Sequence, residues 1–233
     1  MIAGTLNRRT HKGFTLVELL VVIAIVAALA ALSFTVITKM LAKSRTVASV
    51  NNLKQLYVAA EGFAGDHRDV FPATYWGDNS ANPPIPRAYW WTALAPYLYS
   101  DFEANSSGNG KIDGTFRDKA DPRVRTIDDG DFRGGKWKEV SYVPWANGTA
   151  SSNTPIRGIS VTRTEDAAGQ PYLTTASKGG TWAVANEGQY NSYVSGSAAW
   201  RNNQIIVLYC SGAVTIIKDP TYEKVAPAMA DDD

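Results

Sequence analysis

The chain has 233 residues, of which 19% are charged and 45% are hydrophobic, and its formal net charge is +1. A balance this close to neutral argues against a nucleic-acid-binding protein, because such proteins carry a clustered basic surface. Cys210 is the single cysteine, so an intrachain disulfide is excluded. A lone cysteine in a predicted strand is usually a small buried hydrophobic residue, which we expect here in preference to a reactive or intermolecular thiol.

The N-terminal region combines a short basic leader, ending at Gly13, with a long apolar run from Phe14 to Thr38. A bilayer core requires about 20 apolar residues, so this run is long enough to span a membrane. Glu18 is the only charged residue inside it. A carboxylate at mid-helix costs roughly 2.5–3.5 kcal/mol on insertion scales, and less near the end of the span. We therefore expect Glu18 to need a partner.

The residues Gly13-Phe14-Thr15-Leu16-Val17-Glu18 and the apolar residues after them resemble the N-terminal signature of type IV pilins and type II secretion pseudopilins. In that family a prepilin peptidase cuts between the glycine and the phenylalanine and methylates the new N-terminus. The resemblance implies that Gly13 precedes the cut, that Phe14 becomes the methylated N-terminus, and that Glu18 guides assembly with other subunits. A weaker likeness to pilin-like proteins recurs at residues 52–56, 71–72, 91–98 and 207–214.

Elementary electrostatics supports the assembly role of the acid. Cleavage after Gly13 would create a cationic α-amine on Phe14, at the start of a helix that is otherwise surrounded by lipid. The Glu18 carboxylate of a neighbouring subunit could pair with this amine at only one axial stagger. Such a pair sets the register of a filament more than it stabilises it. Small residues at Ala24, Ala27, Ala28 and Ala31 offer a face for close helix packing.

Three simpler interpretations of the N-terminal region remain open. It could be an ordinary secretory signal peptide, cut at the A-x-A-like site Ala28-Leu29-Ala30. It could be a plain membrane anchor without assembly. Glu18 could also stabilise the first helical turn through the helix dipole, which is compatible with an assembly role. Basic residues flank the run on both sides, so only the family resemblance favours a cytoplasmic N-terminus, with the head in the periplasm or on a surface filament.

Beyond the apolar run the helix is expected to continue. Apolar residues recur at three- and four-residue steps from Val47 to Ala64, with polar residues between them, which predicts an amphipathic helix packing one face on a core. No proline occurs between Met1 and Val70. The sequence therefore predicts one helix from about Leu16 to Phe63.

The segment after this helix is rich in turn-forming residues, and residues 73–135 contain few periodic stretches. The exception is the aromatic stretch 89–98, which predicts a short helix or turn packed on the head. Short alternating segments that predict strands follow at residues 140–143, 159–162 and 181–184.

The clearest strand signal lies near the C-terminus. Two β-branched runs, 204–210 and 213–218, flank the dipeptide Ser211-Gly212, which predicts a hairpin with a tight turn. If this hairpin is central, Val207 and Ile216 face the long helix or a neighbouring strand.

These elements together predict an α+β protein, with a long N-terminal helix packed on a small antiparallel sheet. The expected organisation is a leader at residues 1–13, a membrane and assembly helix at 14–38, and an extracytoplasmic head at 39–233 that includes the rest of the helix.

Calcium is the one metal that the sequence suggests. Oxygen-bearing side chains lie in two Gly-rich stretches, and some pseudopilins hold calcium in their head loops, which the resemblance brings into consideration. Neither stretch fits a complete EF-hand, so ordinary surface turns are the alternative. The candidate ligands are Asn109, Asp113, Asp128, Asp129 and Asp131.

Catalytic patterns are scarce, since His67 is the only histidine outside the leader, and we expect a solvated turn there. The expected function is a non-enzymatic filament subunit, whose partners are the prepilin peptidase, other subunits and membrane lipid. The alternative is a membrane-tethered module that binds carbohydrate or mediates adhesion through exposed tryptophans, although we expect most of them in the core. The tryptophans are Trp76, Trp90, Trp91, Trp137, Trp145, Trp182 and Trp200.

Overall fold

The structure is a computed structural model. It describes residues 14–67, 69, 71–72, 75–78, 85–100, 102, 114–122, 140–145, 169–176, 190–191 and 194–225. The strands predicted at 159–162 and 181–184 lie outside these residues. The chain divides into two compact units, one ending at Lys43 and one beginning at Ser44, and the second is called the head below.

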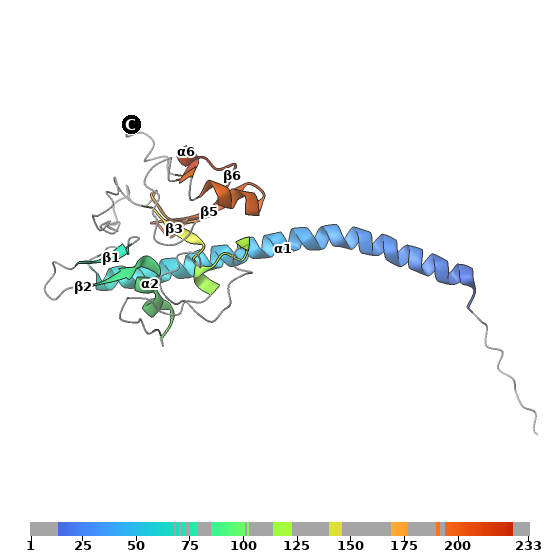
Figure 1. The fold of residues 1–233 in the computed structure, drawn as a ribbon, viewed down its shortest axis with the longest axis horizontal. Helices are drawn as coiled ribbons and strands as arrows, with labels where there is room; N and C mark the ends of the chain where they lie inside the picture. Colours follow the sequence, from blue (N-terminus) through green and yellow to red (C-terminus); the bar gives the residue numbers. More distant parts are fainter. Residues whose placement is uncertain are drawn as a thin grey trace, which may run out of the picture. The chain divides into compact units, whose positions relative to one another are not determined.

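Helix α1 runs without interruption from Leu16 to Asp66, which confirms the single long helix predicted from the sequence (Figure 1). The absence of proline allows this continuity. The helix ends where Asp69 adopts a left-handed backbone, with a φ of 56°. The Asp69 amide then donates a hydrogen bond of 2.9 Å to the carbonyl of Ala64, satisfying one of the last carbonyls of the helix.

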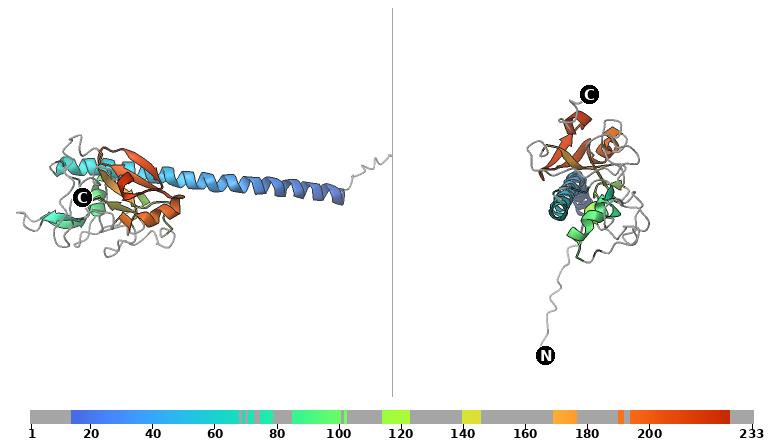
Figure 2. Two further views of the ribbon diagram at one scale, coloured as in Figure 1. Left: turned by 90° about the horizontal axis from the view of Figure 1, so that it is seen from above. Right: turned by 90° about the vertical axis from the view of Figure 1, so that its left-hand side faces the viewer.

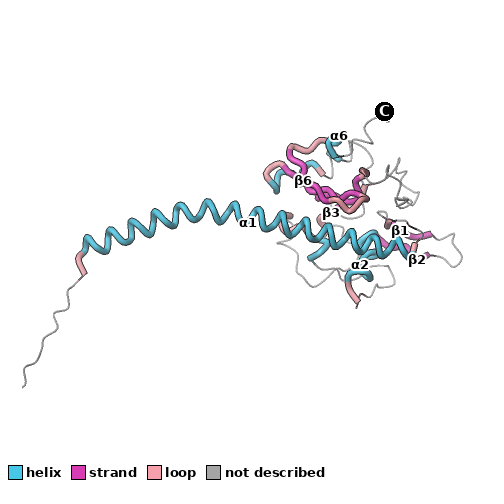
Figure 3. Tube along the Cα trace, turned by 180° about the vertical axis from the view of Figure 1, so that it is seen from behind, coloured by secondary structure: helices cyan, strands magenta, loops and turns pink. Residues whose placement is uncertain are grey.

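The head contains a four-stranded antiparallel sheet in the order β3-β4-β5-β6. Figure 3 draws its strands in magenta and labels β3 and β6. Its strands are β3 (Tyr142–Pro144), β4 (Pro171–Thr175), β5 (Gln204–Tyr209) and β6 (Val214–Lys218). A separate antiparallel pair is formed by β1 (Tyr75–Asp78) and β2 (Ile85–Tyr89). The prediction of an α+β fold is therefore confirmed.

Short helices complete the described part of the head. The aromatic stretch forms α2, as predicted. The remaining short elements were not predicted. The helical elements are α2 (Trp90–Leu98), η1 (Gly114–Phe116), α5 (Ser195–Ala198), η4 (Ala199–Arg201) and α6 (Tyr222–Val225).

The hairpin of β5 and β6 has the predicted position and a tight turn at Ser211-Gly212. Gly212 has a φ of +80°, a conformation that side-chain-bearing residues rarely adopt. A Cβ atom at this position would also lie 2.6 Å from the ring of Tyr57 on α1. The glycine therefore permits both the turn and the close approach of the turn to the helix.

The two faces of the sheet bury two different hydrophobic clusters. The first, called the helix-side cluster, joins the sheet to α1 and α2 and includes Leu53, Leu56, Phe63, Trp90, Ile206 and Leu208. The second, called the outer cluster, lies on the other face and includes Val143, Trp145, Val194, Ile205, Val207 and Val225. Figure 2 shows α1 nearly end-on in its right-hand view.

This arrangement corrects part of the hairpin prediction. Val207 is buried, but it belongs to the outer cluster and not to the face that meets α1. Ile216 was expected to face the long helix or a neighbouring strand as part of the core, and its place in the core is wrong, because its side chain is 42% exposed. It pairs with the fully buried Ile206 and so shares its face of the sheet. Strand β6, however, is an edge strand of the described sheet and pairs with β5 on one side.

The expected burial is confirmed for Cys210 and for three of the tryptophans, whereas Trp200 is only partly buried. Trp90, Trp91 and Trp145 are buried in the core. Cys210 is also buried, in the helix-side cluster, and this burial raises the pKa of its thiol to about 12. A thiol with this pKa is almost wholly protonated at neutral pH and hence a poor nucleophile.

Candidate functional site

The first turn of α1 contains a reciprocal pair of side-chain caps. The backbone amide of Thr15 donates a hydrogen bond of 2.8 Å to Glu18 Oε2, and its hydroxyl donates one of 2.9 Å to the same oxygen. In return, the amide of Glu18 donates a bond of 3.2 Å to Thr15 Oγ1. This is a capping box, in which residues three apart satisfy two amides that the helix leaves without partners.

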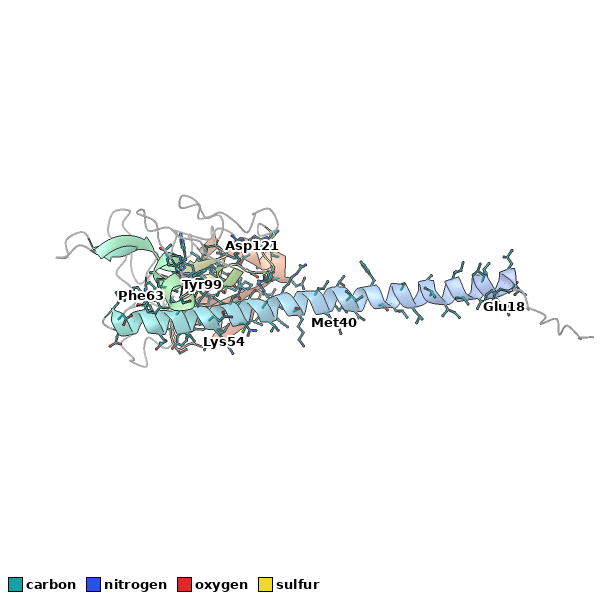
Figure 4. The ribbon with its side chains drawn as sticks, turned by 90° about the horizontal axis from the view of Figure 1, so that it is seen from below. Glu18, Met40, Lys54, Phe63, Tyr99 and Asp121 are labelled. Atoms are coloured by element: carbon teal, nitrogen blue, oxygen red, sulfur yellow. The ribbon has the colours of Figure 1, made fainter. Side chains whose placement is uncertain are left out.

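The capping box gives Glu18 a role within its own helix. Glu18 caps the first helical turn through hydrogen bonds, in addition to the helix-dipole role that the sequence left open, and this cap is compatible with assembly. Both bonds from Thr15 go to Oε2. Within the described residues, Oε1 accepts no hydrogen bond, and the side chain is exposed. The carboxylate can therefore cap its helix and still present an oxygen to a cation outside it. Figure 4 labels Glu18 near the N-terminal end of α1.

Apolar side chains predominate on all sides of α1 between its first turn and Ile37, before Lys39. Large residues along this stretch are about half to four-fifths exposed, from Val21 at 47% to Leu16 at 80%. A helix that is apolar all round is buried in lipid or in a core. By length and composition, α1 is the one helix in the described part of the chain that could cross a membrane.

The predicted processing residues lie at the edge of this helix. Phe14 immediately precedes Thr15 and is 72% exposed. Gly13 lies outside the described residues. Thr15 was not singled out from the sequence, although the pattern Thr-x-x-Glu before an apolar run is a known signal for a capping box. The structure thus adds Thr15 to the set formed by Gly13, Phe14 and Glu18.

Comparison with known proteins identifies the motif at this end of the chain. The family model described as the prokaryotic N-terminal methylation motif matches residues 8–34. The chain carries a prepilin-type methylation motif. The matched range includes Gly13, Phe14, Glu18 and the first part of α1. No curated protein and no solved structure matches the chain.

The motif has direct consequences for the N-terminal region. It supports a type IV pilin-like or pseudopilin precursor, and it implies processing by a prepilin peptidase and assembly with other pilins. Together with the exposed apolar helix, it fits a membrane-anchored pilin.

His67 has a local structural environment at the end of α1. Its ring stacks on Phe63, with the ring centroids 3.8 Å apart and the planes 4° from parallel. Its Nδ1 atom lies 2.8 Å from the carbonyl oxygen of Phe63. Both contacts come from the preceding helical turn, so His67 helps to close the helix.

The calcium hypothesis falls on residues that the structure does not describe. Asn109, Asp113, Asp128, Asp129 and Asp131 all lie outside the described ranges. Within the described ranges, no group of three or more His, Cys, Asp or Glu side chains could hold a metal ion. Calcium binding therefore stays a prediction from the sequence.

Proposed function

We propose that the chain is a structural subunit of a type IV pilus-like or type II secretion filament. The observation that carries this proposal is the methylation motif, placed at the capped end of a helix whose apolar surface is exposed on all sides. Such a surface needs lipid around it before assembly and other helices around it afterwards. In this role the chain has neither enzymatic activity nor a bound cofactor.

The proposed pathway begins in the cytoplasmic membrane, with the N-terminus inside and the head in the periplasm. Prepilin peptidase removes residues 1–13 and methylates Phe14. The new α-amine then lies beside the capping box of Thr15 and Glu18. Lateral packing of α1 with the helices of other subunits builds the filament, which presents the head in the periplasm or at the cell surface.

Glu18 restricts this packing to one axial stagger between neighbouring helices. Its Oε2 atom caps the helix, and its exposed Oε1 atom can accept a hydrogen bond from the α-amine of a neighbouring subunit. An unpaired charge in lipid is costly, so neighbouring subunits favour the stagger that brings amine and carboxylate together. The acid therefore selects the stagger, while helix packing supplies most of the contact area.

The test is the share of a Glu18→Ala variant in sheared surface filaments, relative to total membrane protein. We expect normal cleavage and membrane insertion but a loss of at least tenfold from filaments. Glu18→Gln preserves the shape and removes the charge, and it should also assemble poorly. Ser33→Ala is a control from the same helix, because it removes a hydroxyl that, among the described residues, bonds only to the carbonyl of Leu29.

Either of two results would count against the proposal. A Glu18→Ala protein that enters filaments as well as wild type does would show that the acid is not an assembly residue. A mature protein that begins at Ala31 would instead establish a secretory signal peptide. The tethered binding module is less well supported, because three of the four tryptophans whose burial the structure describes, Trp90, Trp91 and Trp145, are buried, and Trp200 is partly buried.

A further inference from the structure

The part of α1 that follows its apolar stretch carries basic side chains and no acid. No aspartate or glutamate occurs in the sequence between Glu18 and Glu61. Lys39 and Lys43 are exposed, and their ammonium groups form no hydrogen bond or ion pair with any residue that the structure describes. The basic residues of this part of the helix are Lys39, Lys43, Arg45 and Lys54.

The first two of these lysines form a pair on one face of the helix. Lys39 and Lys43 are four residues apart in α1, so their Cβ atoms are about 5–6 Å from each other. Two like charges at this spacing weaken a helix slightly, and a bound anion would remove that cost. The apolar side chains of Met40 and Leu41 are exposed between them. This turn therefore has the mixed composition of a segment at a membrane surface.

The length of the apolar stretch places this turn at the level of the lipid headgroups. A hydrocarbon core of about 30 Å corresponds to about 20 residues of helix. If Leu16 lies at one boundary of the core, the other boundary falls near Val36. Lys39 then lies about 5 Å beyond this boundary and Lys43 about 10 Å, while the headgroup layer is about 5–8 Å thick. The flexible stem of Lys43 can bend its ammonium group back into that layer.

We propose that Lys39 and Lys43 bind the phosphates of anionic lipids, in the leaflet on the head side of the membrane. Each ammonium group donates hydrogen bonds to phosphate oxygens, and the net charge of the lipid compensates the two like charges. A cation at an anionic membrane surface raises lipid affinity about fivefold, which corresponds to about 1 kcal/mol. The inference rests on the proposed membrane anchoring of α1, and it is independent of filament assembly and of which way the chain is oriented.

Lys54 provides a matched comparison in the same helix. It is an exposed lysine like the other two, and it follows Lys43 by eleven residues, or about 16 Å of helix. This distance exceeds the Debye length, which is about 10 Å in 0.1 M salt, so the charge of Lys54 is screened from the headgroups. Arg45 is partly buried and is kept unchanged in every variant.

The experiment uses the full chain in phosphatidylcholine vesicles that contain a trace of spin-labelled lipid. The label is on phosphatidylglycerol, which is anionic, or on phosphatidylcholine, which has no net charge. The motionally restricted part of the electron spin resonance spectrum measures how much of each labelled lipid contacts the protein. In 0.1 M salt we expect phosphatidylglycerol to be enriched about threefold, because only some lipid contacts adjoin the lysines. In 1 M salt, where the Debye length is about 3 Å, the enrichment should fall towards one.

Four variants separate local binding from a general effect of charge. Lys39→Gln together with Lys43→Gln should abolish the enrichment, whereas Lys39→Arg together with Lys43→Arg should retain it. Lys43→Gln alone should lower the enrichment measurably, and Lys54→Gln, which removes the same charge, should leave it unchanged. Glutamine, arginine and lysine have similar helix propensities, so α1 should persist in each variant, which far-ultraviolet circular dichroism checks.

An enrichment that survives in the double glutamine variant would overturn the proposal. If that variant were also lost from filaments, the lysines would instead bind acidic groups of a neighbouring subunit. An equal loss in Lys54→Gln and Lys43→Gln would overturn it as well, because the effect would then follow net charge and not position. A chain that fails to enter the vesicles would contradict the proposed anchoring itself. That failure is distinguishable, because neither labelled lipid would then show a motionally restricted component.

Discussion

At the scale of single residues, Gly212 is constrained by two independent features of the hairpin turn. Its φ of +80° suits glycine, and its position leaves no room for a Cβ atom beside Tyr57. We predict that Gly212→Ala lowers the free energy of unfolding by about 1–3 kcal/mol. Thermal denaturation of the full chain in detergent measures this loss. Gly169→Ala is the matched control, because nothing lies within 4 Å of its added Cβ, and an equal loss there would contradict the argument.

The residues of the N-terminal site were predictable because their signal is local. Gly13, Phe14 and Glu18 form a short motif in which each residue has a fixed place, and the match over residues 8–34 supports the motif. The buried polar contacts among Ser49, Asp118 and Arg201 carried no such signal. Ser49, Asp118 and Arg201 are separated by up to 152 positions, and each of them alone is an ordinary polar residue in the sequence. Only the folded head brings them together.

At the scale of elements, the difference between a central and an edge strand decides what a side chain contributes. Ile206 on β5 is fully buried, whereas its cross-strand partner Ile216 on β6 is 42% exposed. We predict that Ile206→Ala lowers the free energy of unfolding by about 2–5 kcal/mol, as for other buried isoleucines. Ile216→Ala should lower the free energy of unfolding by well under half as much. The reason is that folding removes less of the Ile216 side chain from water.

Thermal denaturation of the two variants in parallel tests this prediction, with the same truncation in both proteins. Equal losses in the free energy of unfolding would mean that another part of the folded protein packs against β6 and buries Ile216. The comparison also explains why burial on this strand could not be predicted from the sequence. The alternation of β6 is the same for an edge strand and a central strand, and only the order β3-β4-β5-β6 distinguishes them.

The elements that were predicted share a strong periodic signal, and those that were missed do not. The helix from Leu16 to Asp66 and the hairpin around Gly212 follow from apolar periodicity and turn chemistry. Strand β4, in contrast, begins with Pro171 and is buried at all five positions. A strand buried on both faces lacks polar–apolar alternation, so its period is hidden. Its position in the middle of the sheet comes from pairing with β3 and β5.

At the scale of the whole molecule, the two units meet different demands. The unit that ends at Lys43 exposes its apolar side chains and needs an apolar environment. The unit that begins at Ser44 contains both hydrophobic clusters and the buried ion pair of Asp118 and Arg201. The exposed surface that needs a membrane and the core that folds the head thus lie in separate parts of the chain, although α1 extends through both.

This separation predicts that the head folds without the membrane helix. A protein that begins at Ala42 lacks most of the exposed apolar surface but retains the residues of α1 from Val50 onward that pack on the helix-side cluster. We expect it to remain in solution without detergent and to unfold in one cooperative thermal transition. Leu56→Ala in this shortened protein should lower the melting temperature clearly, since Leu56 is fully buried and its truncation costs about 2–5 kcal/mol. Broad, non-cooperative melting would show that the head depends on the rest of α1. In that case anchoring and folding would be one requirement, and the head could not be studied apart from the membrane.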